Sequence, residues 1–159
     1  YPLPEAQLDR FLLDIHIDYP TAADERAMLI ATTGTTTPHP EPVITRDQLT
    51  DIQYLVRAMP VSASVVDGIL ALVRGARPET PSLPNLPTLL AWGPGPRAAQ
   101  SLMLAVRARA LLDGRLAPSV DDVAALTAPA LRHRMALSFT ARAAGHTLDG
   151  LLHQLTGIL

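Results

Sequence analysis

The stretch from Gly93 to Gly114 constrains the fold of this chain more than any other. It begins with the turn Gly-Pro-Gly-Pro-Arg, in which Pro96 occupies the first helical position, the one that favours proline. Apolar residues then recur at helical spacing as far as Gly114, and glycine commonly ends a helix. The sequence therefore predicts its longest helix over residues 97–113, entered through a stiff turn.

Arg97 stands at the start of that predicted helix, which is an unusual place for a cation. A positive charge there opposes the helix dipole unless a bound anion reverses the sign of the interaction. Free backbone N–H groups beside a guanidinium also make a phosphate-binding arrangement. From these residues alone, a solvated arginine and a phosphate contact both remain open.

Most of the remaining chain also has helical patterning. Only 4% of the residues are aromatic, so the core must consist of Leu, Val, Ile and Ala, as in helical bundles. Helices are predicted at residues 4–11, 21–31, 45–59, 62–73, 119–135 with an interruption at Pro129, and 147–159. Between them we expect a linker at 32–43, a long ordered loop at 78–96 that Trp92 anchors, and an extended or irregular segment at 137–145.

Residues 13–19 follow a different pattern, in which apolar Leu13, Ile15, Ile17 and Tyr19 alternate with polar residues. This period predicts a β-strand. A single strand is unstable by itself, and no second strand of comparable quality is predicted elsewhere. We therefore predict a mainly α-helical bundle with one N-terminal β-strand, and interpret the chain as a piece of something larger. The unpaired strand would favour dimerisation or exchange of the N-terminal segment.

Composition excludes several kinds of site. The chain has no cysteine, and its 13 basic residues are all arginine, so thiolate sites and lysine-based catalysis are excluded within it. The net charge of −2 argues against nucleic-acid binding. No Ser-His-Asp set or HExxH motif is present, and we expect no metal at Asp14 and His16. No apolar run has the length of a membrane span and no signal peptide is evident, so we expect a cytoplasmic protein without membrane insertion.

Two charged clusters have ordinary alternatives. Arg132-His133-Arg134 could contact DNA in a helix-turn-helix, but salt bridges at a helix end are the favoured interpretation. Arg10 follows Asp9 directly before the predicted strand, where an ordinary surface charge pair is the simpler reading.

Four segments together resemble the MoxR branch of the AAA+ ATPases: residues 1–11 with the strand and Tyr19-Pro20 after them, residues 95–98, residues 107–115 and residues 131–134. The resemblance spans nearly the whole chain. It implies that residues 1–19 are the C-terminal edge of an AAA+ core, with its last helix and strand, and that residues 20–159 are the helical lid domain.

The resemblance also implies roles for individual residues. Arg10 matches the arginine finger that reaches ATP in the neighbouring subunit, and Arg97 matches the sensor-2 arginine that reaches the γ-phosphate in its own subunit, with Pro96 and Ala98 beside it. A glycine replaces the serine that commonly precedes this Pro-Arg pair, so the helix loses a side-chain cap. The Walker A and Walker B motifs would precede Tyr1. ATP and Mg²⁺ are thus expected in the intact parent, and neither binding nor hydrolysis by this piece alone.

For the parent, the resemblance implies ATP hydrolysis in a homo-oligomeric ring, a hexamer, together with chaperone-like remodelling of partner proteins. Its partners would be the remainder of its own AAA+ core and proteins of the von Willebrand factor A type. The alternative is a stand-alone helical protein-interaction module without nucleotide function, and a small DNA-binding helical domain is a third reading.

Overall fold

Side-chain caps begin five of the helices that the structure describes. The fold is known from a computed structural model that describes residues 3–35 and 39–159. Five helices start at a serine or threonine whose side-chain oxygen accepts a backbone N–H of the first turn: α2 (Ala22–Thr33) at Thr21, α3 (Arg46–Ala58) at Thr45, α4 (Ala63–Gly75) at Ser62, α8 (Phe139–Ala143) at Ser138 and α9 (Leu148–Thr156) at Thr147. At α3, Thr45 and Gln48 form a complete capping box, because the Thr45 N–H also donates to Oε1 of Gln48 at 2.8 Å.

The longest helix, α6 (Pro96–Leu112), agrees with its prediction to within one residue at each end. Pro96 is its first residue, and Asp113 is its C-cap. Gly114 follows with a positive φ of 72°, a conformation that side chains with a Cβ rarely adopt. Local chemistry therefore determines both ends of α6.

The chain divides into two compact units. The first contains residues 3–14 and 54–159, and the second contains Ile15–Gln53. The second unit holds α2 and the first part of α3, and neither helix has a buried residue. The first unit holds the core and all the elements described below.

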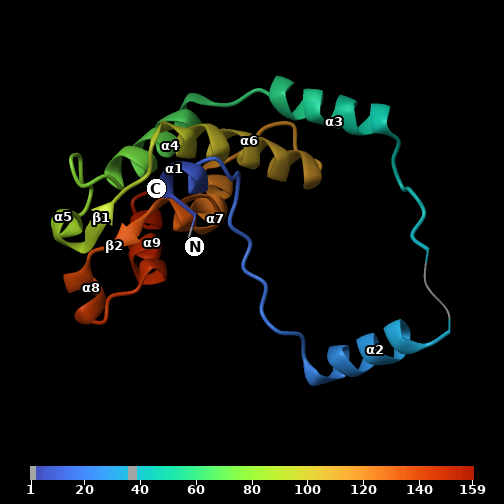
Figure 1. The fold of residues 1–159 in the computed structure, drawn as a ribbon. Helices are drawn as coiled ribbons and strands as arrows, with labels where there is room; N and C mark the ends of the chain where they lie inside the picture. Colours follow the sequence, from blue (N-terminus) through green and yellow to red (C-terminus); the bar gives the residue numbers. More distant parts are fainter. Residues whose placement is uncertain (1–2, 36–38) are drawn as a thin grey trace. The chain divides into compact units, whose positions relative to one another are not determined.

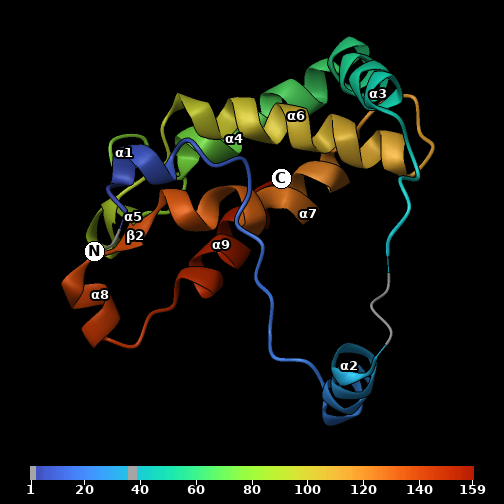
Figure 2. The ribbon, with the colours of Figure 1, turned by 45° about the vertical axis from the view of Figure 1, so that its right-hand side comes forward.

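Four helices of the first unit form the bundle. Helices α4 and α6 pack side by side, α7 (Val120–Leu131) packs against both, and α9 packs against α4 and α7 (Figures 1 and 2). Their inward faces are aliphatic, and the fully buried side chains include Val65, Ile69, Leu102, Val106, Val123, Leu131, Leu152 and Leu155. A mainly α-helical bundle is thus confirmed.

A short antiparallel pair of strands closes one end of the bundle. Strand β1 (Leu90–Trp92) pairs with β2 (Ala136–Leu137), with an irregularity in register between Leu90 and Trp92. A short helix, α5 (Leu86–Leu89), precedes β1. The Ser138 N–H extends the pairing with a 2.7 Å hydrogen bond to the Leu89 carbonyl oxygen.

The N-terminal strand predicted at 13–19 is not formed. Residues 13–19 have neither helix nor strand structure, although the backbone N–H of Asp14 donates to the Pro129 carbonyl oxygen at 2.8 Å. The physical reason is the one that makes any lone strand unstable, since β1 and β2, the strands of the described residues, pair with each other. The helix predicted at 4–11 is also shorter, because α1 covers only Glu5–Leu8.

Three further predictions require correction. The segment at 78–96 is not a plain loop, since it contains α5 and β1. The segment predicted as extended or irregular at 137–145 is extended only at Leu137, the end of β2, and then forms the helix α8. Pro129 does not interrupt its helix, because α7 continues through it to Leu131. In each case the prolines or the short apolar runs predicted a break or a loop, and tertiary packing stabilises a helix or strand there instead.

Most of the large apolar side chains of α3 are exposed. Leu49, Ile52 and Leu55 are exposed, and Met59, just beyond the helix, is buried. No single helix of residues 3–35 and 39–159 is both long and apolar enough to cross a membrane, and only the consecutive pair α3 and α4 reaches that length when taken together.

Candidate functional site

The candidate site begins at the first turn of α6. Gly95 is the N-cap and offers no side chain to the helix, so the turn lacks the cap that serine would supply. Arg97 follows Pro96 and is exposed to solvent, and within the part of the chain that the structure describes its side chain forms no ion pair or hydrogen bond. The guanidinium is therefore free to meet an anion beside the positive end of α6.

Ala98, the third residue predicted to contact nucleotide, faces the other way. Its side chain is fully buried in the core, and its N–H donates to the Gly95 carbonyl oxygen at 3.1 Å. Pro96 is exposed and has no N–H. Of the three, Arg97 alone presents a polar group to solvent at this turn.

A close backbone contact holds the turn before α6 in place. A Cβ on Gly93 would lie 2.6 Å from the Ala76 carbonyl oxygen, so only glycine fits. Nε of Arg77 donates to the Pro94 carbonyl oxygen at 3.0 Å. The corner after α4 thereby fixes the entry to α6 and, with it, the place where Arg97 emerges.

Arg10 lies in the turn directly after α1. Its backbone N–H donates to the Gln7 carbonyl oxygen at 3.0 Å, and its side chain is exposed. The simpler reading, a charge pair with Asp9, is wrong, because the Asp9 carboxylate pairs with Arg134 instead. The side chain of Arg10, like those of Arg97 and several other exposed arginines such as Arg142, therefore has no ion pair or hydrogen bond among the described residues.

Arg134 connects the segment around Arg10 with helix α6, which begins beside Arg97. It belongs to the 3₁₀ turn η1 (Arg132–Arg134) after α7 and is only 1% exposed. Its Nε donates to Oδ1 of Asp9 at 3.0 Å, and its Nη2 donates to Oγ of Ser101 on α6 at 2.9 Å. Burial lowers the pKa of Arg134, and the nearby Asp9 carboxylate opposes this decrease. The guanidinium remains charged, because the ordinary pKa of arginine is very high. Sequence reasoning missed this contact, although it noted salt bridging for residues 132–134.

The backbone of the N-terminal segment completes the shell around Arg134. The guanidinium also donates to the carbonyl oxygens of Asp9 at 3.0 Å, Leu12 at 3.3 Å and Ala130 at 2.5 Å, and to that of Phe11. Residues of α1, the turn at 92–95 and Arg134 line a small hollow of about 210 Å³: Glu5, Ala6, Asp9, Trp92, Gly93, Gly95 and Arg134. Asp9 and Gly95, the residues that line it from the two sides, are chain neighbours of Arg10 and Pro96.

The other members of the basic cluster are also paired. Nη2 of Arg132 lies 2.7 Å from Oδ1 of Asp149, and Nε2 of His133 lies 3.1 Å from the Phe11 carbonyl oxygen. Burial lowers the pKa of His133, which favours a neutral ring that donates to that carbonyl. The salt-bridge interpretation of this cluster is confirmed for Arg132 and Arg134.

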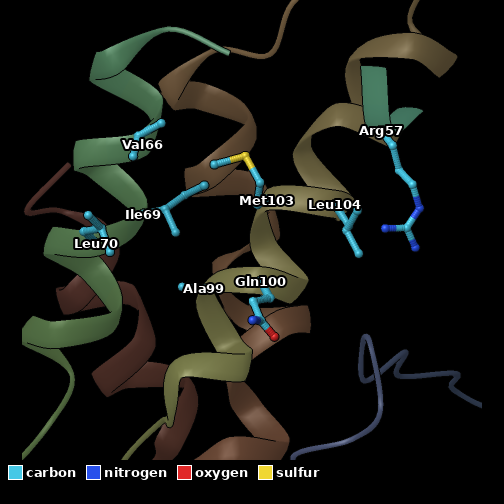
Figure 3. A pocket seen from close by; sticks show the side chains of 8 residues that line it. All are labelled: Arg57, Val66, Ile69, Leu70, Ala99, Gln100, Met103 and Leu104. Carbon is cyan, nitrogen blue, oxygen red and sulfur yellow. The ribbon is translucent and has the colours of Figure 1, made fainter. Parts of the chain in front are cut away.

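An apolar hollow of about 510 Å³ lies between α4 and α6 (Figure 3). Val66, Ile69 and Leu70 reach into it from α4, and Ala99, Gln100, Met103 and Leu104 line it from α6. Arg57 is its one charged lining residue. Its chemistry suits an apolar side chain rather than phosphate.

No metal-binding group of three His, Asp or Glu side chains exists among residues 3–35 and 39–159. His16 lies 3.4 Å from the carboxylate of Asp18, and both side chains are exposed.

Comparisons with known proteins agree on one class of protein. A family model for the AAA lid domain matches residues 88–154. A crystal structure from Cytophaga hutchinsonii, described as a "putative ATPase", superposes with a TM-score of 0.90 at 25% identity, covering 98% of this chain and 48% of that one. The fold and these matches define the class: the chain carries the lid domain of an AAA+ ATPase.

Similar sequences narrow the class to one family. The chain is 34% identical to chaperone MoxR1 of Mycobacterium tuberculosis, 32% identical to YeaC of Bacillus subtilis and 30% identical to protein MoxR of Paracoccus denitrificans. These matches cover 90%, 98% and 87% of this chain but 38%, 46% and 44% of the relatives, so the chain spans less than half of their length. The lid-domain match, these relatives and the solved structure together support a C-terminal region of a MoxR-family AAA+ ATPase.

The described residues fit only one part of a nucleotide site. An exposed guanidinium at an uncapped helix start suits the terminal phosphate of ATP. The chain has no lysine and therefore no Walker A motif with which to hold the other phosphates. Any complete site must include groups from outside these residues.

Proposed function

We propose that this chain closes over ATP in a MoxR-type ATPase, with Arg97 sensing the γ-phosphate bound to its own subunit. The observation that carries the proposal is the free, exposed side chain of Arg97 at the second position of α6, after an N-cap without a side chain. A guanidinium there stabilises negative charge that is spread over phosphate oxygens. Pro96 and the backbone of Ala98 would border the contact.

Arg10 is proposed as the arginine finger that acts on ATP in a neighbouring subunit of a homo-oligomeric ring, a hexamer. Its exposed side chain follows α1, and the backbone on either side of it is held by Arg134. A finger of this kind contributes roughly 10³-fold or more to the rate of phosphoryl transfer. In this proposal residues 1–19 are the edge of the ATPase core, and residues 20–159 are the lid.

Mg²⁺-bound ATP would supply the phosphoryl group and would be held mainly by the rest of the protein. The arginines of this chain orient and neutralise its terminal phosphate. Movement of the lid with nucleotide state would then drive remodelling of partner proteins, including von Willebrand factor A-type proteins. The name of the relative MoxR1, a chaperone, supports this part of the proposal.

The experiment compares Arg97→Ala and Arg10→Ala in the full-length ATPase, with Arg142→Ala on α8 as the control because Arg142 is also exposed. Each of the first two should reduce turnover by about 10²-fold or more, and the control should not. Mixing each variant with subunits that lack a functional Walker A motif separates the roles, because only a finger acts across the interface. A variant that hydrolyses ATP at the normal rate removes its arginine from the proposed role.

A stand-alone helical interaction module is the second candidate, and the apolar hollow between α4 and α6 favours it (Figure 3). This function predicts partner binding that is the same with and without nucleotide and that Arg97→Ala leaves unchanged. The ATPase proposal predicts that both nucleotide and Arg97→Ala alter it.

A further inference from the structure

Arg134 is a buried cation whose hydrogen bonds join three parts of the chain. Four of them go to residues 9–12: two to Asp9, one to Phe11 and one to Leu12. One goes to the Ala130 carbonyl oxygen at the end of α7, and one goes to the hydroxyl of Ser101 on α6. All three nitrogens of the guanidinium are thus engaged, and the network has little freedom to rearrange.

The positions of these acceptors are informative. Asp9 and Phe11 flank Arg10, so Arg134 holds the backbone immediately before and after the proposed finger. Ser101 is four residues after Arg97 in α6, which places the two on the same face, one turn apart. A single guanidinium therefore contacts both the segment that carries Arg10 and the helix face that carries Arg97.

We propose that Arg134 is a positioning residue that ties the Arg10 segment at the edge of the core to the first turns of α6 in the lid, so that a change in the position of the lid is transmitted to Arg10. The inference rests on the proposed function of Arg10 and Arg97. Closure of the lid over nucleotide in one subunit then shifts the finger that points to the next subunit. This link couples ATP hydrolysis in one subunit to hydrolysis in the next. The coupling appears as a cooperative dependence of turnover on ATP concentration.

Arg134→Lys tests the link in the full-length ATPase. Lysine keeps the charge but not the planar fork, so it cannot reach the carboxylate of Asp9 and the hydroxyl of Ser101 together. We expect turnover to fall about tenfold and cooperativity to disappear, while the affinity for a fluorescent ATP analogue changes by less than about twofold. The matched control is Arg132→Lys in the same 3₁₀ turn, whose partner Asp149 is on the surface, and it should leave all three quantities unchanged.

A double-mutant cycle distinguishes positioning from a general loss of structure. If Arg134 acts through Arg10, the variant with both Arg10→Ala and Arg134→Lys turns over ATP at the rate of Arg10→Ala alone. The inference is overturned if the losses of turnover in the two single variants multiply in the double variant. It is also overturned if Arg134→Lys has normal turnover and cooperativity. If Arg134→Lys does not fold, Ser101→Ala takes its place, since it removes only the α6 end of the link, and normal cooperativity in that variant likewise overturns the inference.

The two proposals fail separately. Normal hydrolysis in Arg10→Ala and Arg97→Ala refutes the proposed function and the coupling with it. If those two variants lose turnover but Arg134→Lys and Ser101→Ala retain normal cooperativity, only the coupling is refuted.

Discussion

Arg115 donates two hydrogen bonds to the buried carboxylate of Asp122, from Nη1 to Oδ2 and from Nη2 to Oδ1, both at 2.7 Å. Nε of Arg109 lies 3.1 Å from the same carboxylate, and the Ser119 N–H donates to it at 2.8 Å. The ion pair of Arg115 and Asp122 joins the loop after α6 to the first turn of α7, and these two helices have the most extensive mutual packing. Because the carboxylate is almost fully buried, its partners are not replaceable by water.

Asp122→Asn should destabilise this chain by about 2 kcal/mol, because the amide keeps the shape but removes the buried charge that Arg109 and Arg115 share, and Arg115 then keeps only the exposed carboxylate of Asp113. Urea unfolding followed by circular dichroism gives the free energy. Asp121→Asn is the matched control, since Asp121 is the exposed neighbour in the same turn, and it should change stability by no more than about 0.5 kcal/mol. Equal effects of the two variants would contradict this account of Asp122.

Stability should depend on pH through the same carboxyl group. The hydrogen bonds from Arg115 lower the pKa of Asp122 from 3.8 to about 2. A depressed pKa stabilises the fold above the unfolded-state value, and that contribution is lost as the pH falls from about 4 to about 2. It amounts to roughly 2 kcal/mol. Urea midpoints measured between pH 6 and pH 2 should therefore fall less steeply in Asp122→Asn than in the parent chain.

Gly93→Ala should destabilise the chain by about 2 kcal/mol, because the new Cβ would lie 2.6 Å from the Ala76 carbonyl oxygen and 3.2 Å from Cα of Arg77. Gly68→Ala on α4 provides the opposite case. Its Cβ would make an ordinary 3.5 Å contact with Leu159, so the gain in helix propensity should stabilise the chain by about 0.5 kcal/mol. Thermal unfolding of the two variants should move in opposite directions.

Gly95→Ser should restore a side-chain cap to α6 and stabilise the chain by a few tenths of a kcal/mol, or about 0.5 kcal/mol at most. The nearest atom to the new Cβ is Oδ2 of Asp9 at 3.6 Å, so the side chain fits without displacement. Chemical denaturation measures the change, with Gly95→Ala as the control that adds the Cβ but no hydroxyl. A serine variant no more stable than the alanine variant would exclude the capping explanation.

Local features of the fold were predictable because they depend on residues a few positions apart. Thr45 and Gln48, Pro96 and Gly114 act within one turn of their own helix, and the structure has the predicted helix boundaries there. The exposure of Arg97 at the entry to α6 also follows from its position in the sequence. Its role and that of Arg10 are predictions from the family resemblance, to be tested by the variants above.

The strand predicted at 13–19, which the structure lacks, shows the limit of prediction from local sequence patterns. Alternation of apolar and polar residues gives a segment the ability to form a strand, but a partner decides whether it does. The same limit applies to β1 and β2, which are too short to be recognised before they are brought together.

The sequence by itself determined the long helices of this protein and the two arginines that match the AAA+ pattern, but not the short helices α5 and α8. Tertiary structure alone decided that Arg134 is buried and that it bonds to Asp9, 125 residues away along the chain. The physical reason is that a cap satisfies hydrogen bonds already close together, whereas a buried cation requires acceptors from several segments at once, and only folding supplies them.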